Sequence, residues 1–317
     1  TCSSRSPPSC SASRWAPWDI KEANNTSKKY YNKKLKYEEK RMKVAFVTGA
    51  NGGFGKLISI ELLKAGFIVI AAMRNTVKQQ ELVETAKQLQ LENNLNIIEM
   101  DVTEEKQIIL ARDWLSSKYK YLDVLVNNAG YSQGGLISDL EIGDWERQMD
   151  TNLLGVIRTT KYLLPFLKNA ERGQIINVSS VSGFFGFPGL GPYVTSKFAL
   201  EGFSESLRLE LQPDNIYVSL VEPASFKTGI WEKGLELAAE PQEKDILKRN
   251  TFQYAKKAYE NAGDPTEVAR LVRKITEAKK PKLRYRVGKS ANTLWNVKKI
   301  IPWSIVEKAV LHKLMNK

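Results

Sequence analysis

Short apolar runs alternate with longer amphipathic stretches along the chain from residue 43 to about residue 289. The runs are rich in Val and Ile, as buried parallel strands are. They predict strands at 43–48, 67–72, 95–100, 122–127, 174–179, 216–221 and 283–287. Helical periodicity between them predicts helices near 53–65, 76–93, 103–118, 142–170, 192–212 and 264–278. A repeated strand–helix order implies an α/β fold, with a parallel sheet covered by helices on both faces.

The first 41 residues differ from the rest of the chain. They are rich in Ser, Pro, Asn and Lys and have no hydrophobic period, which indicates disorder. The early Ser and Arg residues allow a transit peptide. We favour another interpretation, in which Met42 is the true start and residues 1–41 are a translated leader. Glu38-Glu39-Lys40-Arg41 can be encoded by a purine-rich stretch that resembles a bacterial ribosome-binding site.

Two further segments are set apart by their composition. Residues 225–262 form a long insert before the last predicted helix, and we expect a lid over the substrate there. Residues 290–317 combine Trp295 and Trp303 with several Lys residues in a basic amphipathic extension. Such a helix can lie on an anionic membrane surface. We favour a helix that packs over the lid or a partner subunit. Residues 42–289 then form a single catalytic domain.

The net charge of +13 is unevenly distributed. Residues 1–41 hold ten Lys or Arg and four Asp or Glu, residues 270–317 hold fourteen and two, and residues 42–269 hold twenty-four and twenty-nine. The body is therefore mildly acidic, which argues against nucleic-acid binding.

Composition also limits the location and the chemistry of the protein. No run of eighteen apolar residues predicts a transmembrane helix, and the N-terminus lacks the apolar core of a secretory signal. We expect a cytoplasmic protein. Cys2 and Cys10 are the only cysteines and His312 is the only histidine. We therefore expect no disulfide, no metal site and no histidine-based triad in the folded body.

The candidate chemistry begins with Tyr193 and Lys197. A Tyr four residues before a Lys on a helix shares one face with it, and a nearby ammonium favours the phenolate. Ser180 precedes Tyr193 by thirteen residues. The chain has two other Tyr-x-x-x-Lys pairs, but both lack this Ser: residues 17 and 272 are Pro and Val. A Tyr with a lowered pKa suits proton exchange with a carbonyl or alcohol beside a hydride carrier.

A glycine-rich turn, Gly49-x-x-x-Gly53-x-Gly55, follows the first predicted strand and opens a helix. This arrangement brings the backbone close to a dinucleotide pyrophosphate at the helix N-terminus. The second strand is followed by Arg74, with no acid to bind ribose hydroxyls. An Arg can bind a 2′-phosphate, so the sequence predicts NADP(H) rather than NAD(H). In the alternative interpretation, Arg74 is a solvated loop charge.

Two later segments also suggest contacts with the nucleotide. Asp101-Val102 after the third strand is placed to meet the adenine edge, and Asp101 can also be the N-cap of the next helix. Asn127-Asn128-Ala129-Gly130 ends the fourth strand, where small residues and amides either lie against the cofactor or tie neighbouring strands together.

These residues together resemble the short-chain dehydrogenase/reductase family, in its compact single-domain branch, over residues 43 to about 289. The resemblance implies a Rossmann-type doubly wound seven-stranded sheet and a nicotinamide cofactor. It implies that Tyr193 is the general acid/base, that Lys197 lowers its pKa and holds the nicotinamide ribose, that Ser180 binds the substrate carbonyl, and that Asn152 holds a water linked to Lys197. Ser179 is the competing serine, and the thirteen-residue interval favours Ser180.

The cofactor residues implied in this way include the catalytic Tyr193 and Lys197. The full set is Gly49, Asn51, Gly53, Phe54, Gly55, Arg74, Asp101, Val102, Asn128, Ala129, Gly130, Tyr193, Lys197, Pro223 and Thr228. One departure from the family is Ala224, which follows Pro223 where many members have Gly. Ala restricts the backbone where the nicotinamide carboxamide binds. We still assign Thr228 to the carboxamide.

The substrate is expected to be a small apolar carbonyl or alcohol. Residues 181–192 are rich in Phe and Gly and suggest an apolar, adjustable wall similar to that of retinol- and 17β-hydroxysteroid-dehydrogenase-like members. Ordinary core packing by Phe184, Phe185 and Phe187 explains the same pattern. A homodimer or homotetramer is implied by the resemblance alone. The competing functions are NAD-linked alcohol oxidation, an epimerase or dehydratase with the same Tyr and Lys, and a non-catalytic dinucleotide sensor.

Overall fold

A computed structural model describes residues 41–230, 234 and 245–315. The chain divides into two units, Thr1–Arg41 and Met42–Lys317, and the elements below all belong to the second. The leader interpretation of residues 1–41 falls almost wholly outside the described residues, as does much of the expected lid at 225–262.

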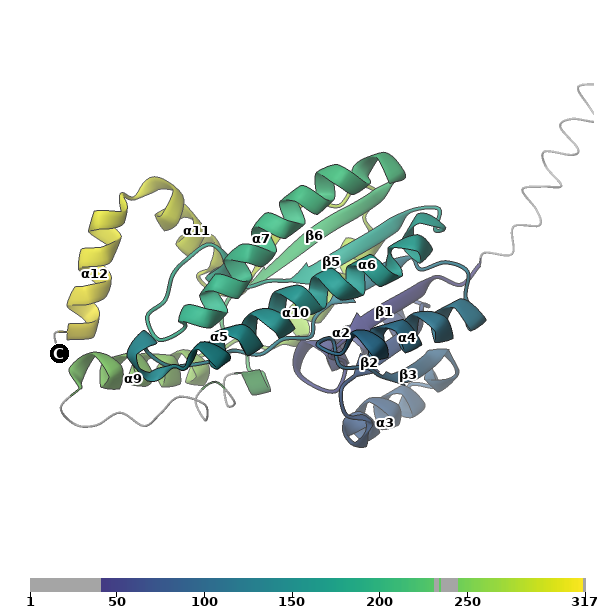
Figure 1. Cartoon of the computed structure of the whole chain (residues 1–317), viewed down its shortest axis with the longest axis horizontal. Coiled ribbons are helices and arrows are strands. Elements are labelled where there is room, and N and C mark those ends of the chain that lie inside the picture. The colour runs from purple at the N-terminus through teal and green to yellow at the C-terminus, as the bar shows by residue number, and fades with distance from the viewer. Residues whose placement is uncertain (1–40, 231–233, 235–244, 316–317) are drawn as a thin grey trace, which may run out of the picture. The chain divides into compact units, whose positions relative to one another are not determined.

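Seven parallel strands form one sheet, in the order β3-β2-β1-β4-β5-β6-β7 (Figure 1). The order reverses direction beside β1, which is the doubly wound topology that the sequence predicts. The strands are β1 (Val44–Thr48), β2 (Ile68–Met73), β3 (Leu95–Glu99), β4 (Val124–Asn127), β5 (Gly173–Val178), β6 (Ile216–Pro223) and β7 (Arg284–Val287). Each predicted strand is confirmed to within two residues.

Alternating side chains of the strands form two cores, one on each face of the sheet. In β1, Ala45 and Val47 belong to one core, and Val44 and Phe46 belong to the other. The first core is covered by α2 (Gly53–Lys64), α3 (Gln80–Gln88) and α10 (Thr266–Glu277). The second is covered by α4 (Glu105–Lys118), α6 (Gly155–Lys168) and α7 (Gly191–Leu211). The expectation of helices on both faces is therefore confirmed.

A third, smaller core joins the C-terminal helices to the loop after β5. Val181, Phe184 and Phe185 pack there with Ala291 of α11 (Ala291–Ile300) and Val306 of α12 (Trp303–Met315). In addition, α12 lies against α9 (Ile246–Glu260), as Figure 1 shows. The amide of Asn250 in α9 donates to the Leu314 carbonyl at 2.6 Å. The C-terminal extension thus packs on this chain's own loop and helix.

Two predicted helices are interrupted. The predicted helix 142–170 is α5 (Ile142–Met149), a π-turn (Asp150–Leu154) and α6, which follow one another without a loop. The predicted helix 76–93 begins as a 3₁₀ turn (Thr76–Gln79), capped by the Asn75 side chain, and continues as α3. Short polar residues that bond the nearby backbone favour such local turns over a regular helix.

The helix predicted at 264–278 is α10, which begins two residues later at Thr266, and the Asp264 carboxylate accepts from the Thr266 backbone N–H at 2.9 Å. The N-cap role suggested for Asp101 is wrong. Glu104 is the residue that precedes the first turn of α4. The Asp101 carboxylate instead accepts from the N–H and hydroxyl of Thr103, which builds a tight turn ahead of the helix.

Candidate active site

Helix α7 carries the central pair of the site. Tyr193 and Lys197 lie one turn apart, with the Lys197 ammonium 5.6 Å from the centroid of the Tyr193 ring. Ser180 follows β5, and its hydroxyl hydrogen-bonds the Tyr193 side chain. The same Ser180 oxygen accepts from the Ser182 N–H at 3.1 Å, which fixes the serine in place. The structure therefore brings Ser180, Tyr193 and Lys197 together.

Burial dominates the electrostatics of this pair. Burial raises the pKa of Tyr193, and the hydrogen bond with Ser180 opposes the rise. Burial lowers the pKa of Lys197 to about 8, and the charge of Glu201 opposes that change. The Lys197 ammonium donates to the Val178 carbonyl at 2.8 Å. The expected lowering of the Tyr193 pKa by Lys197 is thus not found in this structure, because desolvation of the phenolate outweighs the other contributions.

The π-turn between α5 and α6 holds Asn152, which is buried. Its amide donates to the Tyr131 carbonyl at 3.0 Å and to the Ser196 hydroxyl at 3.1 Å, and its oxygen accepts from the Tyr131 N–H. Ser196 in turn donates to the Tyr193 carbonyl at 2.7 Å. Asn152 therefore ties the loop after β4 to α7 beside Lys197. π-turns of this kind occur often at functional sites.

The glycine turn at the end of β1 has no room for a side chain at Gly49 or at Gly55. Gly49 has a φ of +65°, and a Cβ there would lie 2.8 Å from the Ala129 Cα. A Cβ on Gly55 would lie 2.2 Å from the Gly49 carbonyl oxygen. No side chain caps the N-terminus of α2, and its first turn holds no acidic residue. The backbone N–H groups there suit an anionic pyrophosphate.

The segment after β4 closes this turn. The Asn128 amide donates to the Thr48 and Gly49 carbonyls at 2.9 and 3.1 Å, and the Thr48 hydroxyl accepts from the N–H groups of Asn128 and Ala129. A Cβ on Gly130 would lie 3.0 Å from the Asn152 oxygen. These contacts assign a strand-tying role to Asn128. Thr48 was missed by sequence reasoning, although its place just before the glycine turn was a usable signal.

The residues expected to choose the nucleotide lie beyond β2 and β3. The Arg74 side chain is 73% exposed, and its Nε is 3.8 Å from the Asp101 carboxylate. Val102 is buried and contacts Gly155 at the start of α6. Val102 also lines a small pocket together with Thr48 and Ala129. Arg74 is thus free to reorient, whereas Val102 is fixed in the core.

The remaining expected residues lie around the glycine turn and the loop after β6. Phe54 packs edge-on against Phe226, with ring centroids 5.7 Å apart. A Cβ on Gly53 would lie 3.6 Å from the Thr228 side chain, so that Thr228 faces the turn. Pro223 ends β6. Asn51 lies within the turn, half-buried.

The aromatic residues after Ser180 face the C-terminal helices. Phe184 packs edge-on against Trp295 at 5.2 Å, and Phe185 lies 6.1 Å from the Trp303 ring. Phe184 and Phe185 are buried, and Phe187 packs beside them. Core packing, the simpler of the two interpretations of this segment, accounts for Phe184 and Phe185.

Among the described residues, no helix is long and apolar enough to cross a membrane. Within the same residues, no three His, Cys, Asp or Glu side chains are grouped as a metal site requires.

Comparison with protein families matches residues 43–236 to the short chain dehydrogenase model. The uncharacterized oxidoreductase YusZ of Bacillus subtilis is 40% identical over 86% of this chain and 99% of its own length. A 3-ketodihydrosphingosine reductase of Bacteroides thetaiotaomicron is 33% identical over 80% of this chain and 90% of its own. Human retinol dehydrogenase 5 is 32% identical over 83% of this chain and 86% of its own length.

Solved structures agree with the fold. A short-chain dehydrogenase from Streptomyces avermitilis superposes with a TM-score of 0.72 at 29% identity, covering 85% of this chain and 98% of its own. A serine dehydrogenase complexed with NADP+ superposes with a TM-score of 0.66 at 27% identity, covering 77% of this chain and 94% of its own. A short chain dehydrogenase/reductase from Burkholderia phymatum in complex with NAD superposes with a TM-score of 0.71 at 23% identity, covering 84% of this chain and 95% of its own.

Proposed function

Because the chain belongs to the short-chain dehydrogenase/reductase family, and is thus an oxidoreductase that acts with NAD(P), we propose that it interconverts a carbonyl and an alcohol on an apolar substrate with NADP(H). The observation that carries this proposal is the meeting of Ser180, Tyr193 and Lys197 in a chain that also has a closely packed glycine turn after β1. The nicotinamide supplies or accepts the hydride when it is bound.

The protein residues supply binding, orientation and a proton. Tyr193 gives the phenolic proton to the substrate oxygen in reduction and takes it back in oxidation. Ser180 donates a hydrogen bond to the same oxygen as its negative charge develops. Lys197 holds the nicotinamide ribose and its positive charge favours the phenolate, whereas burial raises the pKa of Tyr193. Asn152 fixes α7 through Ser196.

Arg74 supports NADP(H) over NAD(H), because its exposed guanidinium can leave Asp101 for a 2′-phosphate. The test is fluorescence titration of the full chain with NADPH and NADH. We expect tighter NADPH binding, weakened about tenfold or more in Arg74→Ala. Lys78→Ala is the matched control, because Lys78 is an exposed cation in the next turn. Equal or tighter NADH binding, unchanged in Arg74→Ala, would turn the proposal to NAD-linked alcohol oxidation.

The names of two relatives support an apolar lipid-like substrate. NADPH oxidation should be measured with a steroid ketone, retinal and a long-chain ketone, with a small polar ketone as the reference. We expect a kcat/KM at least tenfold higher for one of the apolar carbonyls. Preference for the polar ketone would contradict the substrate class.

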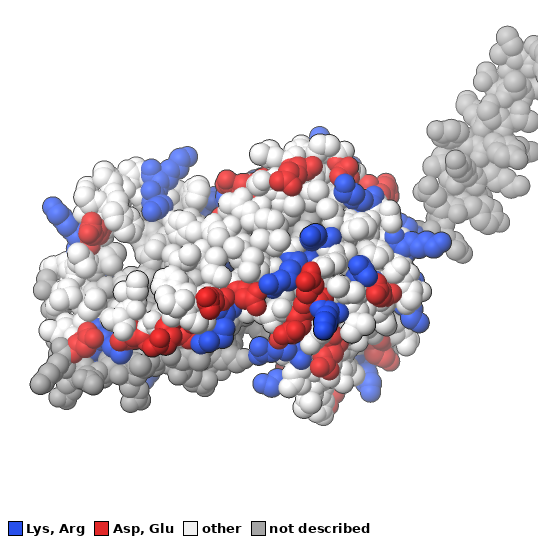
Figure 2. Space-filling model, in the orientation of Figure 1, with Lys and Arg blue, Asp and Glu red and all other residues white. Residues whose placement is uncertain are grey.

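A homo-oligomer formed through α7 is the assembly that we propose. Phe198 and Leu209 of α7 are 42% and 75% exposed. Figure 2 shows a broad uncharged area over the first half of that helix. Exposed apolar side chains that share one helix favour a subunit interface.

Peripheral membrane contact is the alternative use of the C-terminal helices, where Ile300 and Ile305 are exposed among Lys residues. Loss of liposome binding on truncation after Gly288, with activity retained, would favour the membrane.

A further inference from the structure

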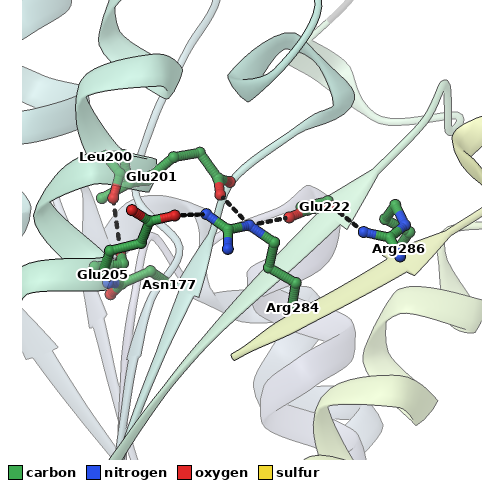
Figure 3. A network of polar contacts seen from close by, with 8 residues as sticks. Asn177, Leu200, Glu201, Glu205, Glu222, Arg284 and Arg286 are labelled. Atoms are coloured by element: carbon green, nitrogen blue, oxygen red, sulfur yellow. Dashed lines mark hydrogen bonds and ion pairs between the residues drawn. The ribbon is translucent and has the colours of Figure 1, made fainter. Parts of the chain in front are cut away.

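A cluster of charged side chains lies between α7, β6 and β7 (Figure 3). Glu201 follows Lys197 by four residues on α7, so that the two side chains share one side of the helix. Glu222 is the penultimate residue of β6 and is fully buried. The cluster thus adjoins the proposed catalytic lysine without being part of the catalytic set.

Arg284 of β7 is the centre of this cluster. Its Nε lies 3.0 Å from the Glu201 carboxylate and 3.1 Å from that of Glu222, and a terminal nitrogen contacts the exposed Glu205 at 2.5 Å. Arg286 lies 3.7 Å from the other Glu222 oxygen. The strand register explains the arrangement. Glu222 pairs with Arg286 across the two strands, and Arg284 projects from the same face two residues earlier.

The arrangement leaves negative charge facing Lys197. Three carboxylates share two guanidinium groups, and the second Glu201 oxygen is buried and, by distance and angle, has no hydrogen-bond partner among the described residues. A Cβ on Gly183 would lie 3.1 Å from that oxygen and 2.8 Å from the Ser179 hydroxyl, so no larger residue fits there. Glu201 therefore faces Lys197 and Glu205 on its own helix, Glu222 from β6, Arg284 from β7 and Ser179 from the loop after β5.

We propose that Glu201, clamped by Arg284 and backed by Glu222, is a positioning residue that keeps Lys197 in its charged form during the reaction. The proposal rests on the function proposed above, in which that charge stabilises the Tyr193 phenolate. Without an opposing carboxylate, burial alone favours a neutral lysine.

The electrostatics agree with the geometry. The charge of Glu201 raises the pKa of Lys197 against the effect of burial, which leaves it at about 8. Burial and the Glu201 charge raise the pKa of Glu222 to about 7, so Glu222 binds a proton close to neutral pH. Burial raises the pKa of Glu201 as well, and the neighbouring Arg284 guanidinium opposes that rise, so Arg284 favours an ionised Glu201 opposite the lysine.

The test measures the titration of Lys197 directly, by NMR of the full chain labelled with 13Cε-lysine and assigned with Lys197→Met. In Glu201→Gln we expect the Lys197 pKa to fall by about 0.5–1 unit, because an opposing charge is lost. The alkaline limb of the kcat/KM profile should move down with it. Glu205→Gln is the matched control, because Glu205 binds the same Arg284 from an exposed position. It should leave both readouts close to wild type.

A purely structural role for Glu201 would lower thermal stability without moving either titration, and an unchanged Lys197 pKa in Glu201→Gln would overturn the proposal. If Glu201→Gln does not fold, Glu222→Gln provides the test: it removes a second carboxylate and leaves Arg284 to pair with Glu201 alone, so the Lys197 pKa should fall, and no fall would overturn the proposal. Wild-type protein that turns over no carbonyl refutes the proposed function instead, while the lysine titration still reports on the cluster.

Discussion

At the residue scale, the proposed mechanism depends on a charged lysine placed where burial disfavours charge. The pKa of Lys197 is lowered from 10.5 to about 8. Below pH 8 this lysine is charged in both the folded and the unfolded chain, so the cost of burying its charge is fully present. As the pH rises from 8 to 10.5, only the unfolded chain keeps the proton, and this cost is relieved. The proposed function therefore needs Lys197 charged, whereas the stability of the fold would be higher with residue 197 uncharged.

This conflict predicts the effect of Lys197→Met. Removing a charge whose burial costs about 3 kcal/mol should stabilise the fold at pH 7. Loss of the hydrogen bond to the Val178 carbonyl reduces the gain. We expect the free energy of unfolding in urea to rise by about 1–2 kcal/mol, with an advantage that shrinks toward pH 10. Lys161→Met is the control, because Lys161 is exposed on α6, and it should change stability little. A less stable Lys197→Met at pH 7 would show that lysine contacts outweigh desolvation.

At the element scale, the π-turn at Asp150–Leu154 and the loop after β4 hold α7 in place. No sequence pattern indicates this turn, because hydrophobic spacing continues through it from α5 into α6. The strands could be predicted, since a buried parallel strand needs an uninterrupted apolar run. The spatial partners of Asn152 could not, because Tyr131 and Ser196 are twenty-one and forty-four residues away.

Asn152→Ala tests this element. The substitution leaves the Tyr131 N–H without its partner and removes one of the two side-chain donors to the Tyr131 carbonyl, which should lower the free energy of unfolding by about 1–3 kcal/mol. It should also reduce kcat, because Ser196 loses its link to the turn. Asn169→Ala is the control, since that exposed amide makes one hydrogen bond to the Lys120 carbonyl and should cost about 0.5 kcal/mol. Equal urea stability of the two variants would contradict the bridging role.

At the scale of the whole molecule, most candidate site residues follow the carboxyl ends of six strands, β1 to β6. The family and the seven-stranded fold were predictable, because motif order and strand periodicity both lie within the sequence. The cluster around Arg284 was not predictable, since Glu201, Glu222 and Arg284 come from three elements far apart in sequence. Their one local signal was an acid four residues after Lys197.

The exposed apolar side chains of α7 lead to a prediction about assembly. Phe198→Glu should shift the sedimentation of the full chain toward monomer, because it places a charge within the proposed subunit interface. Leu110→Glu on α4 is the control: Leu110 is 68% exposed, and its substitution should leave the assembly unchanged. Identical sedimentation of wild type and both variants would argue against an interface on α7.

The most direct test of the account separates proton transfer from nucleotide binding at one residue. Tyr193→Phe should retain NADPH affinity within about threefold of wild type and lose turnover by about 10²–10⁴-fold, because it removes only the phenolic proton. Gly55→Val should do the reverse and abolish NADPH binding, since a side chain there meets the Gly49 carbonyl. Turnover by Tyr193→Phe at the wild-type rate would contradict the assignment of Tyr193 as the acid/base.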